Sequence, residues 1–243
     1  MVSRNDPKAW CPSRWIGERA IRFWLLLAGP GVLLFLCGMA NHGLKDAQEP
    51  YVGGIIREMV DSRDWVVPTL NGQPYLEKPP LYYICGSLFA LLFHSFAPWV
   101  LRLPSALFSL ATVLWIAWLG RRRGSSTAGW WAGLMVGTSD LFFRTGHTAV
   151  VDMSLVFTVS LGLGFVWLLN EEPENQARWS NCVWLGMGLA FLAKGPLGPL
   201  LIGLPLVAQL VLFRDLPLLR RLFKPRWGMA LCVSMAGSWI LLL

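Results

Sequence analysis

The sequence predicts an all-α, polytopic membrane protein with about seven transmembrane helices and juxtamembrane helices in its first outer loop. Of its 243 residues, 55% are hydrophobic and only 14% are charged, which is too apolar for a soluble domain. Its apolar runs also approach the ~20 residues that a helix needs to cross a bilayer. The net charge of +7 does not indicate nucleic acid as a partner, because the basic residues form short blocks beside apolar segments.

The first predicted span covers about residues 21–40. The segment before it, residues 1–20, carries Arg4, Lys8, Arg14 and Arg19, so the positive-inside rule places it in the cytoplasm. The sequence shows no A-x-A-like cleavage site here, which favours a retained helix over a signal peptide. Residue 41 therefore opens an outer loop.

The apolar stretch at residues 81–97 decides the rest of the topology. If it crossed the bilayer, the triplet Arg121-Arg122-Arg123 would lie outside, against the positive-inside rule. The stretch is also short, flanked by aromatic residues and bounded by prolines, which is typical of an interfacial or re-entrant helix. We therefore predict a first outer loop at about residues 41–98. Within it, residues 51–60 have the spacing of an amphipathic helix that lies on the membrane.

Six further spans follow from the apolar runs and the basic blocks. They cover residues 103–120, 127–146, 153–169, 181–193, 197–213 and 227–243. In this scheme each strongly basic loop is cytoplasmic. Charged side chains then meet at the outer face, where charge beside lipid is costly and usually serves function or pairing. These side chains are Glu49, Glu77, Lys78, Asp152 and Lys194.

A series of short motifs runs through the first outer loop and the helices that follow it. The motifs are Arg57-Glu58-Met59, Asp64-Trp65-Val66-Val67-Pro68, Leu70-Asn71-Gly72, Tyr75 through Pro80, Arg102-Leu103-Pro104-Ser105, Asp152-Met153 and Leu192-Ala193-Lys194-Gly195-Pro196. Each is weak alone, but together and in this order they are specific. Over residues 20–213 the chain resembles the bacterial lipid-linked-sugar glycosyltransferases related to protein O-mannosyltransferases and to the aminoarabinose transferases that modify lipid A.

The resemblance implies an integral protein of the plasma (inner) membrane with its active site on the outer, periplasmic face. Such enzymes transfer a sugar from a polyprenyl-phosphate donor to a lipid or protein acceptor. They need a base for the acceptor, cations for the departing phosphate and an apolar groove for the prenyl tail. Relatives continue with more helices, so we expect residues 21–243 to form an N-terminal transmembrane glycosyltransferase module that is truncated at the C-terminus.

The resemblance also locates the base, at a position where this chain departs from the pattern. The family opens its first outer loop with an Asp-Glu pair whose Asp is the proposed base, and Gln48-Glu49 stands there in this chain. Because a glutamine cannot accept a proton, either Glu49 or Asp46 acts as the catalytic base or the activity is lost. The alternative is that Asp46 and Glu49 only cap the amphipathic helix.

The other candidate residues follow from the same motifs. Lys78, with Glu77, matches the family's donor-phosphate motif, and a structural ion pair is the alternative. Lys194 stands at the outer end of an apolar helix and is expected to bind phosphate, unless it snorkels to the interface. Asp152 matches a second acidic, catalytic position, or else caps its helix. Arg102, also a candidate for substrate binding, is expected to pair with Asp152, Asp140 or a lipid phosphate.

Cofactors and a non-catalytic role stay open at this point. A divalent metal could bind Glu77 and Asp152, but two carboxylates do not specify one, and the five cysteines and three histidines are scattered without metal-ligand spacing. The expected partners are the lipid-linked donor, the acceptor and membrane lipids. The alternative hypothesis is a catalytically inactive lipid-binding or scaffold fragment, which Gln48 favours because a glutamine cannot act as a base.

Overall fold

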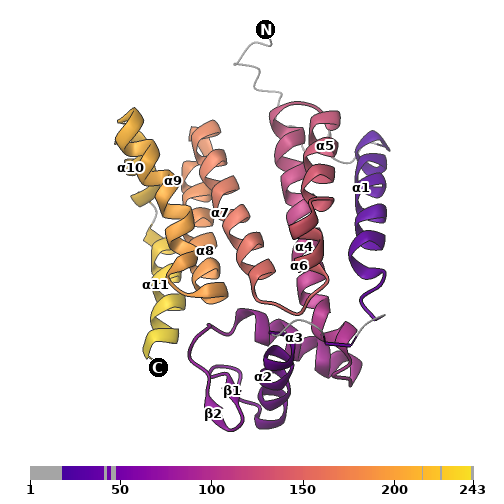
Figure 1. Cartoon of the computed structure of the whole chain (residues 1–243). Coiled ribbons are helices and arrows are strands. Elements are labelled where there is room, and N and C mark those ends of the chain that lie inside the picture. Colours follow the sequence, from indigo (N-terminus) through magenta and orange to yellow (C-terminus); the bar gives the residue numbers. More distant parts are fainter. Residues whose placement is uncertain (1–17, 41–42, 45–47, 215, 225, 242–243) are drawn as a thin grey trace.

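The chain folds into a bundle of helices capped at one end by a small layer of shorter elements (Figure 1). The computed structural model describes residues 18–40, 43–44, 48–214, 216–224 and 226–241. The bundle helices are α1 (Glu18–Leu36), α4 (Pro98–Arg123), α5 (Ser126–Gly137), α6 (Asp140–Gly146), α7 (Asp152–Glu171), α8 (Gln176–Lys194), α9 (Leu197–Phe213) and α11 (Arg226–Leu241). The short helices η3 (Pro173–Asn175) and α10 (Leu216–Phe223) lie at the end opposite the layer.

The layer consists of α2 (Glu49–Ser62), a hairpin of β1 (Thr69–Leu70) and β2 (Gln73–Pro74), and α3 (Leu81–Phe93). The helix α3 lies across the end of the bundle and does not run along it (Figure 1), as expected for a segment that does not span. The predicted amphipathic helix is confirmed as α2, whose face of Val52, Ile55, Ile56 and Met59 is buried. We call this part of the molecule, residues 48–97, the juxtamembrane layer.

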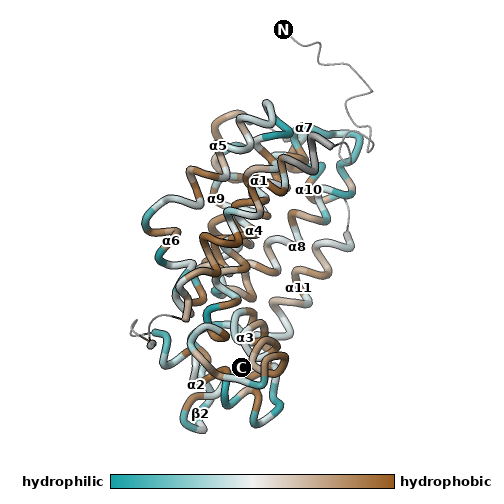
Figure 2. Tube along the Cα trace, turned by 90° about the vertical axis from the view of Figure 1, so that its right-hand side faces the viewer, coloured by the Kyte–Doolittle hydropathy of each residue, from teal (hydrophilic) through white to brown (hydrophobic). Residues whose placement is uncertain are grey.

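Hydropathy follows the same division. Figure 2 shows hydrophobic residues concentrated along the middle of the bundle and hydrophilic residues at its two ends. Two helices, α4 and α7, are both long and apolar enough to cross a membrane, within the part of the chain that the structure describes. Shorter apolar segments run over Phe23–Leu36, Leu81–Phe93, Leu197–Phe213 and Trp227–Leu241.

Glycines set the distances between the central helices. A Cβ on Gly186 of α8 would lie 3.0 Å from the Cα of Gly162 in α7. One on Gly198 of α9 would lie 2.1 Å from the carbonyl oxygen of Ala190 in α8. Such contacts leave no room for a side chain, and close backbone approach at small residues is how helices associate in lipid.

The structure corrects several predicted boundaries. The predicted span at residues 127–146 is interrupted, because α5 ends at Gly137 and a separate helix α6 begins at Asp140. Two residues lie between the helices: Ser139 has an extended backbone, and the hydroxyl of Thr138 donates to the carbonyl of Leu134. Helix α8 begins at Gln176 and takes up much of the polar loop predicted before residue 181, and α4 begins at Pro98, five residues earlier than predicted.

Basic residues mark the end of the bundle opposite the juxtamembrane layer, which we call the basic end. The last turn of α4 carries Arg121, Arg122 and Arg123. Arg122 pairs with Glu172 just after α7, and Arg123 pairs with Glu171 at the end of α7. Helix α10 and the start of α8 lie at this same end (Figure 1). The arginines of α4 and of α10 therefore lie at the end opposite the juxtamembrane layer.

Candidate active site

The first turn of α2 is fixed by a buried ion pair. Both carboxylate oxygens of Glu49 accept from Arg102 of α4, with Nε 2.7 Å from Oε1 and Nη2 2.9 Å from Oε2. Glu49 is fully buried and Arg102 nearly so. The same Oε1 accepts from the backbone N–H of Ala149 at 2.9 Å. A charge removed from water in this way must be paired and hydrogen-bonded, and this one is.

The guanidinium of Arg102 also holds the chain between α1 and α2. Its Nη1 donates to the carbonyl of Met39 at 2.7 Å and its Nη2 to the carbonyl of Gly43 at 2.9 Å. Arg102 therefore ties the segment after α1 to the first turn of α2. Its partner Glu49 connects this junction to Ala149, in the segment before α7. Arginine suits this kind of junction because its planar guanidinium carries five N–H donors in a fixed geometry, which the ammonium group of a lysine could not reproduce.

A second buried network lies beside the first. The phenol of Tyr82 in α3 donates to the carbonyl of Leu101, 3.1 Å away, and lies 2.8 Å from the hydroxyl of Ser105. The Ser105 hydroxyl is also 3.2 Å from the carbonyl of Val150. Through Ala149 and Val150, both networks position the residues that lead into Asp152 at the start of α7.

Asp152 and Lys194 form an ion pair at the juxtamembrane end of the bundle. The Nζ of Lys194, in the last turn of α8, donates to Oδ1 of Asp152, the first residue of α7. The two side chains keep 32% and 40% of their surface exposed, for Lys194 and Asp152 respectively. Val151 and not Asp152 occupies the N-cap position of α7. The pair is thus accessible, in contrast to Glu49 and Arg102.

The Glu77-Lys78-Pro79-Pro80 segment lies next to this pair. A Cβ on Gly195, the residue after Lys194, would lie 4.0 Å from Cγ of Pro79. Lys78 donates from Nζ to the side-chain oxygen of Gln48 at 3.3 Å, which connects the segment to the residue before α2. Pro79 and Pro80 fix φ at the two positions after Lys78, so the backbone next to the lysine is rigid.

Glu77 is held by its neighbour in the hairpin. Its Oε2 accepts from the phenol of Tyr75 at 3.0 Å. Partial burial of the ring, followed by the nearby carboxylate of Glu77, raises the pKa of Tyr75 to about 12. The phenol therefore remains a donor across the physiological range. Glu77 is exposed, and among the described residues no hydrogen bond or ion pair joins it to Asp152.

Other motif residues build the juxtamembrane layer. The carboxylate of Glu58 accepts from the backbone N–H groups of Asn71 at 2.5 Å and Gly72 at 3.2 Å. Both residues have positive φ, 54° and 72°, as the two-residue Asn-Gly turn of a hairpin requires. Hydrogen bonds from the Thr69 side chain and these N–H groups lower the pKa of Glu58. Asp64 similarly accepts from the N–H groups of Val66 and Val67.

The structure thus sorts the residues singled out by sequence into separate groups. It brings together Asp152 with Lys194, and Lys78 with Gln48. It joins Glu49 to Arg102, although Glu49 was not among the partners expected for that arginine. It also joins Arg144 to Asp140. Asp46 lies outside the described residues. Within the described ranges no three His, Cys, Asp or Glu side chains gather in a group that could hold a metal.

Sequence reasoning missed Tyr82, Ser105 and the backbone of residues 149–150 as a supporting network. Their positions in the sequence could have indicated them, because Tyr82 lies two residues after Pro79-Pro80 and Ser105 is the last residue of the Arg102-Leu103-Pro104-Ser105 motif. The pairing of Glu49 with Arg102, 53 residues apart, has no local signal. Only the packing of α2 against α4 reveals it.

Comparison with known proteins identifies the family to which the chain belongs. Residues 77–241 match the family of the dolichyl-phosphate-mannose-protein mannosyltransferases. The chain is similar to the undecaprenyl phosphate-alpha-4-amino-4-deoxy-L-arabinose arabinosyl transferases of Edwardsiella ictaluri, with 27% identity over 79% of this chain and 35% of that one. It is likewise similar to that of Pseudomonas aeruginosa, with 31% identity over 75% of this chain and 34% of that one.

A solved structure shares the fold. The crystal structure of ArnT from Cupriavidus metallidurans bound to undecaprenyl phosphate superposes with a TM-score of 0.83 at 28% identity, and the match covers 92% of this chain and 41% of that one. The apo structure of the same protein gives the same score. The chain therefore spans less than half the length of these relatives. Its helices are those of a membrane protein, and the chain belongs to the dolichyl-phosphate-mannose-protein mannosyltransferase family.

Proposed function

We propose that this chain forms the N-terminal membrane module of a glycosyltransferase that moves a sugar from a polyprenyl-phosphate donor to a lipid or protein acceptor on the outer face of the membrane. The observation that carries the proposal is the accessible Asp152–Lys194 pair, which lies beside the rigid Lys78 segment at the juxtamembrane end. Ammonium groups next to an exposed carboxylate suit a reaction in which a phosphate leaves and a hydroxyl loses its proton.

The proposed topology places the basic end in the cytoplasm and the juxtamembrane layer outside. Its support is the segregation of the arginines of α4 and of α10 at one end and of Lys78, Asp152 and Lys194 at the other. Seven crossings result if α5 and α6 together form one interrupted span and α3 stays at the interface. The N-terminus is then cytoplasmic, by the positive-inside rule.

Each accessible residue has a proposed role in the transfer. The acceptor oxygen attacks C1 of the sugar, the bond from C1 to the phosphate oxygen breaks, and the phosphate leaves with that electron pair. Lys78 and Lys194 bind the phosphate, since each ammonium has three donors and Lys194 uses one on Asp152. Asp152, which lies beside Lys194 and keeps 40% of its side-chain surface exposed, takes the acceptor proton in this proposal. The donor that the relatives' names suggest is undecaprenyl phosphate-4-amino-4-deoxy-L-arabinose.

Glu49 and Arg102 serve as positioning residues in this proposal. A base must touch the group that it deprotonates, and Glu49 has no exposed surface and all its carboxylate oxygens engaged. Arg102 is likewise occupied by Glu49 and two carbonyls. Their part is to hold α2 and residues 149–151 so that Asp152 faces Lys194.

A catalytically silent lipid-binding or scaffold module is the second candidate. Gln48 favours it, because the amide at the position of the family's expected base cannot accept a proton and instead accepts a hydrogen bond from Lys78. In that case the site would bind the polyprenyl phosphate without transferring the sugar.

One experiment separates the two candidates. Transfer of radiolabelled aminoarabinose from its undecaprenyl-phosphate carrier is measured in membranes that contain the natural protein, alongside binding of undecaprenyl phosphate to the purified protein. We expect Asp152→Asn to abolish transfer while it leaves binding nearly unchanged, and Gln48→Asp to change transfer only modestly. If wild type binds undecaprenyl phosphate but transfers nothing, and Gln48→Asp creates transfer, the silent module is correct.

A further inference from the structure

We propose that the basic end of the bundle binds an anionic phospholipid, with one acyl chain in an apolar cavity between α8, α9 and α10 and the headgroup against the cations of α10. This site lies at the opposite end of the bundle from Asp152 and Lys194 (Figure 1). It is therefore separate from the proposed donor site and does not depend on the proposed transfer reaction.

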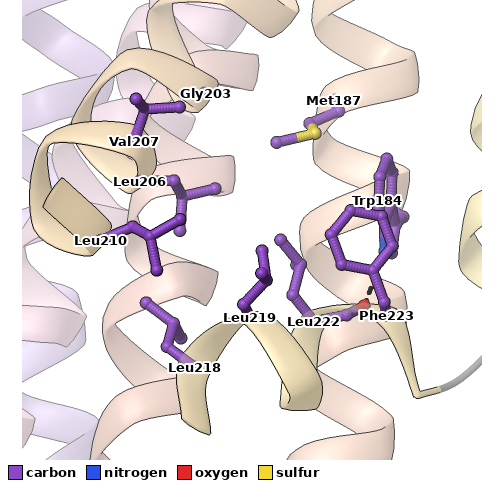
Figure 3. A pocket seen from close by; sticks show the side chains of 10 residues that line it. All are labelled: Trp184, Met187, Gly203, Leu206, Val207, Leu210, Leu218, Leu219, Leu222 and Phe223. Atoms are coloured by element: carbon purple, nitrogen blue, oxygen red, sulfur yellow. Dashed lines mark hydrogen bonds between the residues drawn. The ribbon is translucent and has the colours of Figure 1, made fainter. Parts of the chain in front are cut away.

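The cavity has a volume of about 200 Å³ and an almost wholly apolar lining. This exceeds the roughly 150 Å³ at which an apolar cavity in a protein stays dry and binds a small hydrocarbon. Figure 3 shows side chains from the three helices around it, including Met187 of α8, Leu206 of α9 and Leu222 of α10. The polar atom at its wall, Nε1 of Trp184, already donates to the carbonyl of Leu222 at 2.9 Å. A hydrocarbon chain therefore fits the chemistry of the lining.

The cavity opens to the surface of the bundle. Two of its lining side chains, Val207 and Phe223, keep 56% and 49% of their surface exposed. Gly203 contributes no side chain, and a Cβ built on it would meet nothing within 4 Å. In a membrane protein an apolar opening of this kind faces lipid tails, so an acyl chain can enter from the side.

Helix α10 has the amphipathic character of a helix that lies at the membrane surface. Leu218 and Leu222 are buried against the bundle, while Arg220 and the following Lys224 are exposed. The segment from Arg214 to Arg226 contains five basic residues and one acidic residue. Its cations thus stand at the same helix whose apolar face closes the cavity.

Arg220, Arg221 and Lys224 lack carboxylate partners among the described residues, in contrast to the arginines of α4 at the same end. Arg122 and Arg123 pair with Glu172 and Glu171, whereas no ion pair in the described part of the chain involves Arg220, Arg221 or Lys224. Clustered basic residues on an amphipathic helix attract anionic lipid headgroups. Charge and cavity together select a phospholipid with a negative headgroup over a neutral lipid or an uncharged prenyl tail.

The test uses the chain reconstituted in nanodiscs of phosphatidylcholine that contain a small fraction of phosphatidylglycerol with a photoreactive diazirine in its acyl chain. After illumination, mass spectrometry maps the cross-linked peptides. We expect the label on peptides from α8, α9 and α10, and a loss of at least fivefold in Gly203→Leu, whose side chain would occupy the cavity. Gly237→Leu in α11, an equally open glycine, is the matched control and should label as wild type does.

A second pair of variants tests the headgroup. Replacing Arg220 and Lys224 by alanine should reduce labelling by photoreactive phosphatidylglycerol severalfold relative to the phosphatidylcholine analogue, while Arg123→Ala, which removes an already paired arginine, should not. The proposal is overturned if Gly203→Leu labels as strongly as Gly237→Leu, if the two lipids label equally in wild type, or if labelling maps elsewhere. Gel filtration of each variant verifies the fold, and neither readout requires transferase activity.

Discussion

We expect Glu49→Gln to lower the free energy of unfolding by several kcal/mol, although the two side chains have nearly the same shape. The substitution keeps the shape of the side chain but removes the negative charge that faces Arg102. The new amide nitrogen would point a donor at the guanidinium, so one of the two ionic hydrogen bonds, at 2.7 and 2.9 Å, is replaced by a clash of donors. Because both groups are buried, leaving Arg102 without its counter-charge should cost about 3–5 kcal/mol. That is a large fraction of a typical total stability of roughly 5–15 kcal/mol.

The free energy of unfolding can be measured by steric trapping in lipid bicelles. Glu171→Gln is the matched control, since it breaks an exposed ion pair with Arg123 and should cost no more than about 1 kcal/mol. The double variant Glu49→Gln/Arg102→Met should recover part of the loss, because removing both charges is less costly than stranding one. Suppose instead that the free energy of unfolding of Glu49→Gln lies within about 1 kcal/mol of wild type, as for an exposed pair, while transfer is lost. The anchoring role of Glu49 is then refuted, and Glu49 is again a candidate for the catalytic base.

Three further predictions concern the outer face and its hairpin. Lys78→Ala should weaken binding of undecaprenyl phosphate by about 1.5–3 kcal/mol, the range for a hydrogen bond to a charged group, in a binding titration where Lys78→Arg keeps part of the affinity; unchanged affinity would remove Lys78 from the site. In a background free of native cysteines, Ser126→Cys beside the α4 arginines should react with a membrane-impermeant thiol reagent only from the cytoplasmic side, and Gln73→Cys in the hairpin only from outside; reaction of both from one side would contradict the topology. The lowered pKa of Glu58 means that its stabilisation of the hairpin is present above the ordinary carboxyl pKa of 4.5 and is lost as the pH falls through the lowered value, so protease cleavage between β1 and β2 should rise in acid in wild type and already be high at neutral pH in Glu58→Gln.

The fold class and the layer outside the bundle were readable from the sequence. Length and apolarity predict the helices, and the helical spacing of apolar positions predicts a helix over residues 51–60, which the structure extends to Glu49–Ser62 as α2. The basic triplet in the last turn of α4 predicts that α3 does not cross, and the structure lays that helix across the end of the bundle. These features depend on patterns within one segment, which a single sequence displays fully.

The parts that escaped prediction depend on contacts between distant segments. The break between α5 and α6 falls in a stretch that was predicted as a single span and is marked by the short polar run Thr138, Ser139 and Asp140. The partner of Arg102 lies 53 residues away and that of Lys194 lies 42 residues away. No periodicity encodes such pairings, so sequence alone placed Glu49 with the catalytic groups although the packing of α2 buries it.

The geometry changes what the shared motifs imply about chemistry. Glu58 supports the hairpin turn, Arg102 clamps α2, and Ser105 holds the segment before α7, so resemblance at these positions carries the fold and would persist in an inactive relative. Lys78, Asp152 and Lys194 are motif residues whose charges lie at the juxtamembrane end of the bundle and are not fully buried, and Gln48 accepts a hydrogen bond from Lys78. The departure at Gln48 therefore falls beside the residues of the proposed donor site, where a substitution is expected to change the proposed reaction more than the packing of the fold. Gln48→Asp should accordingly leave the unfolding free energy nearly constant, since Gln48 is exposed, and any change that it causes in transfer can be assigned to the reaction itself.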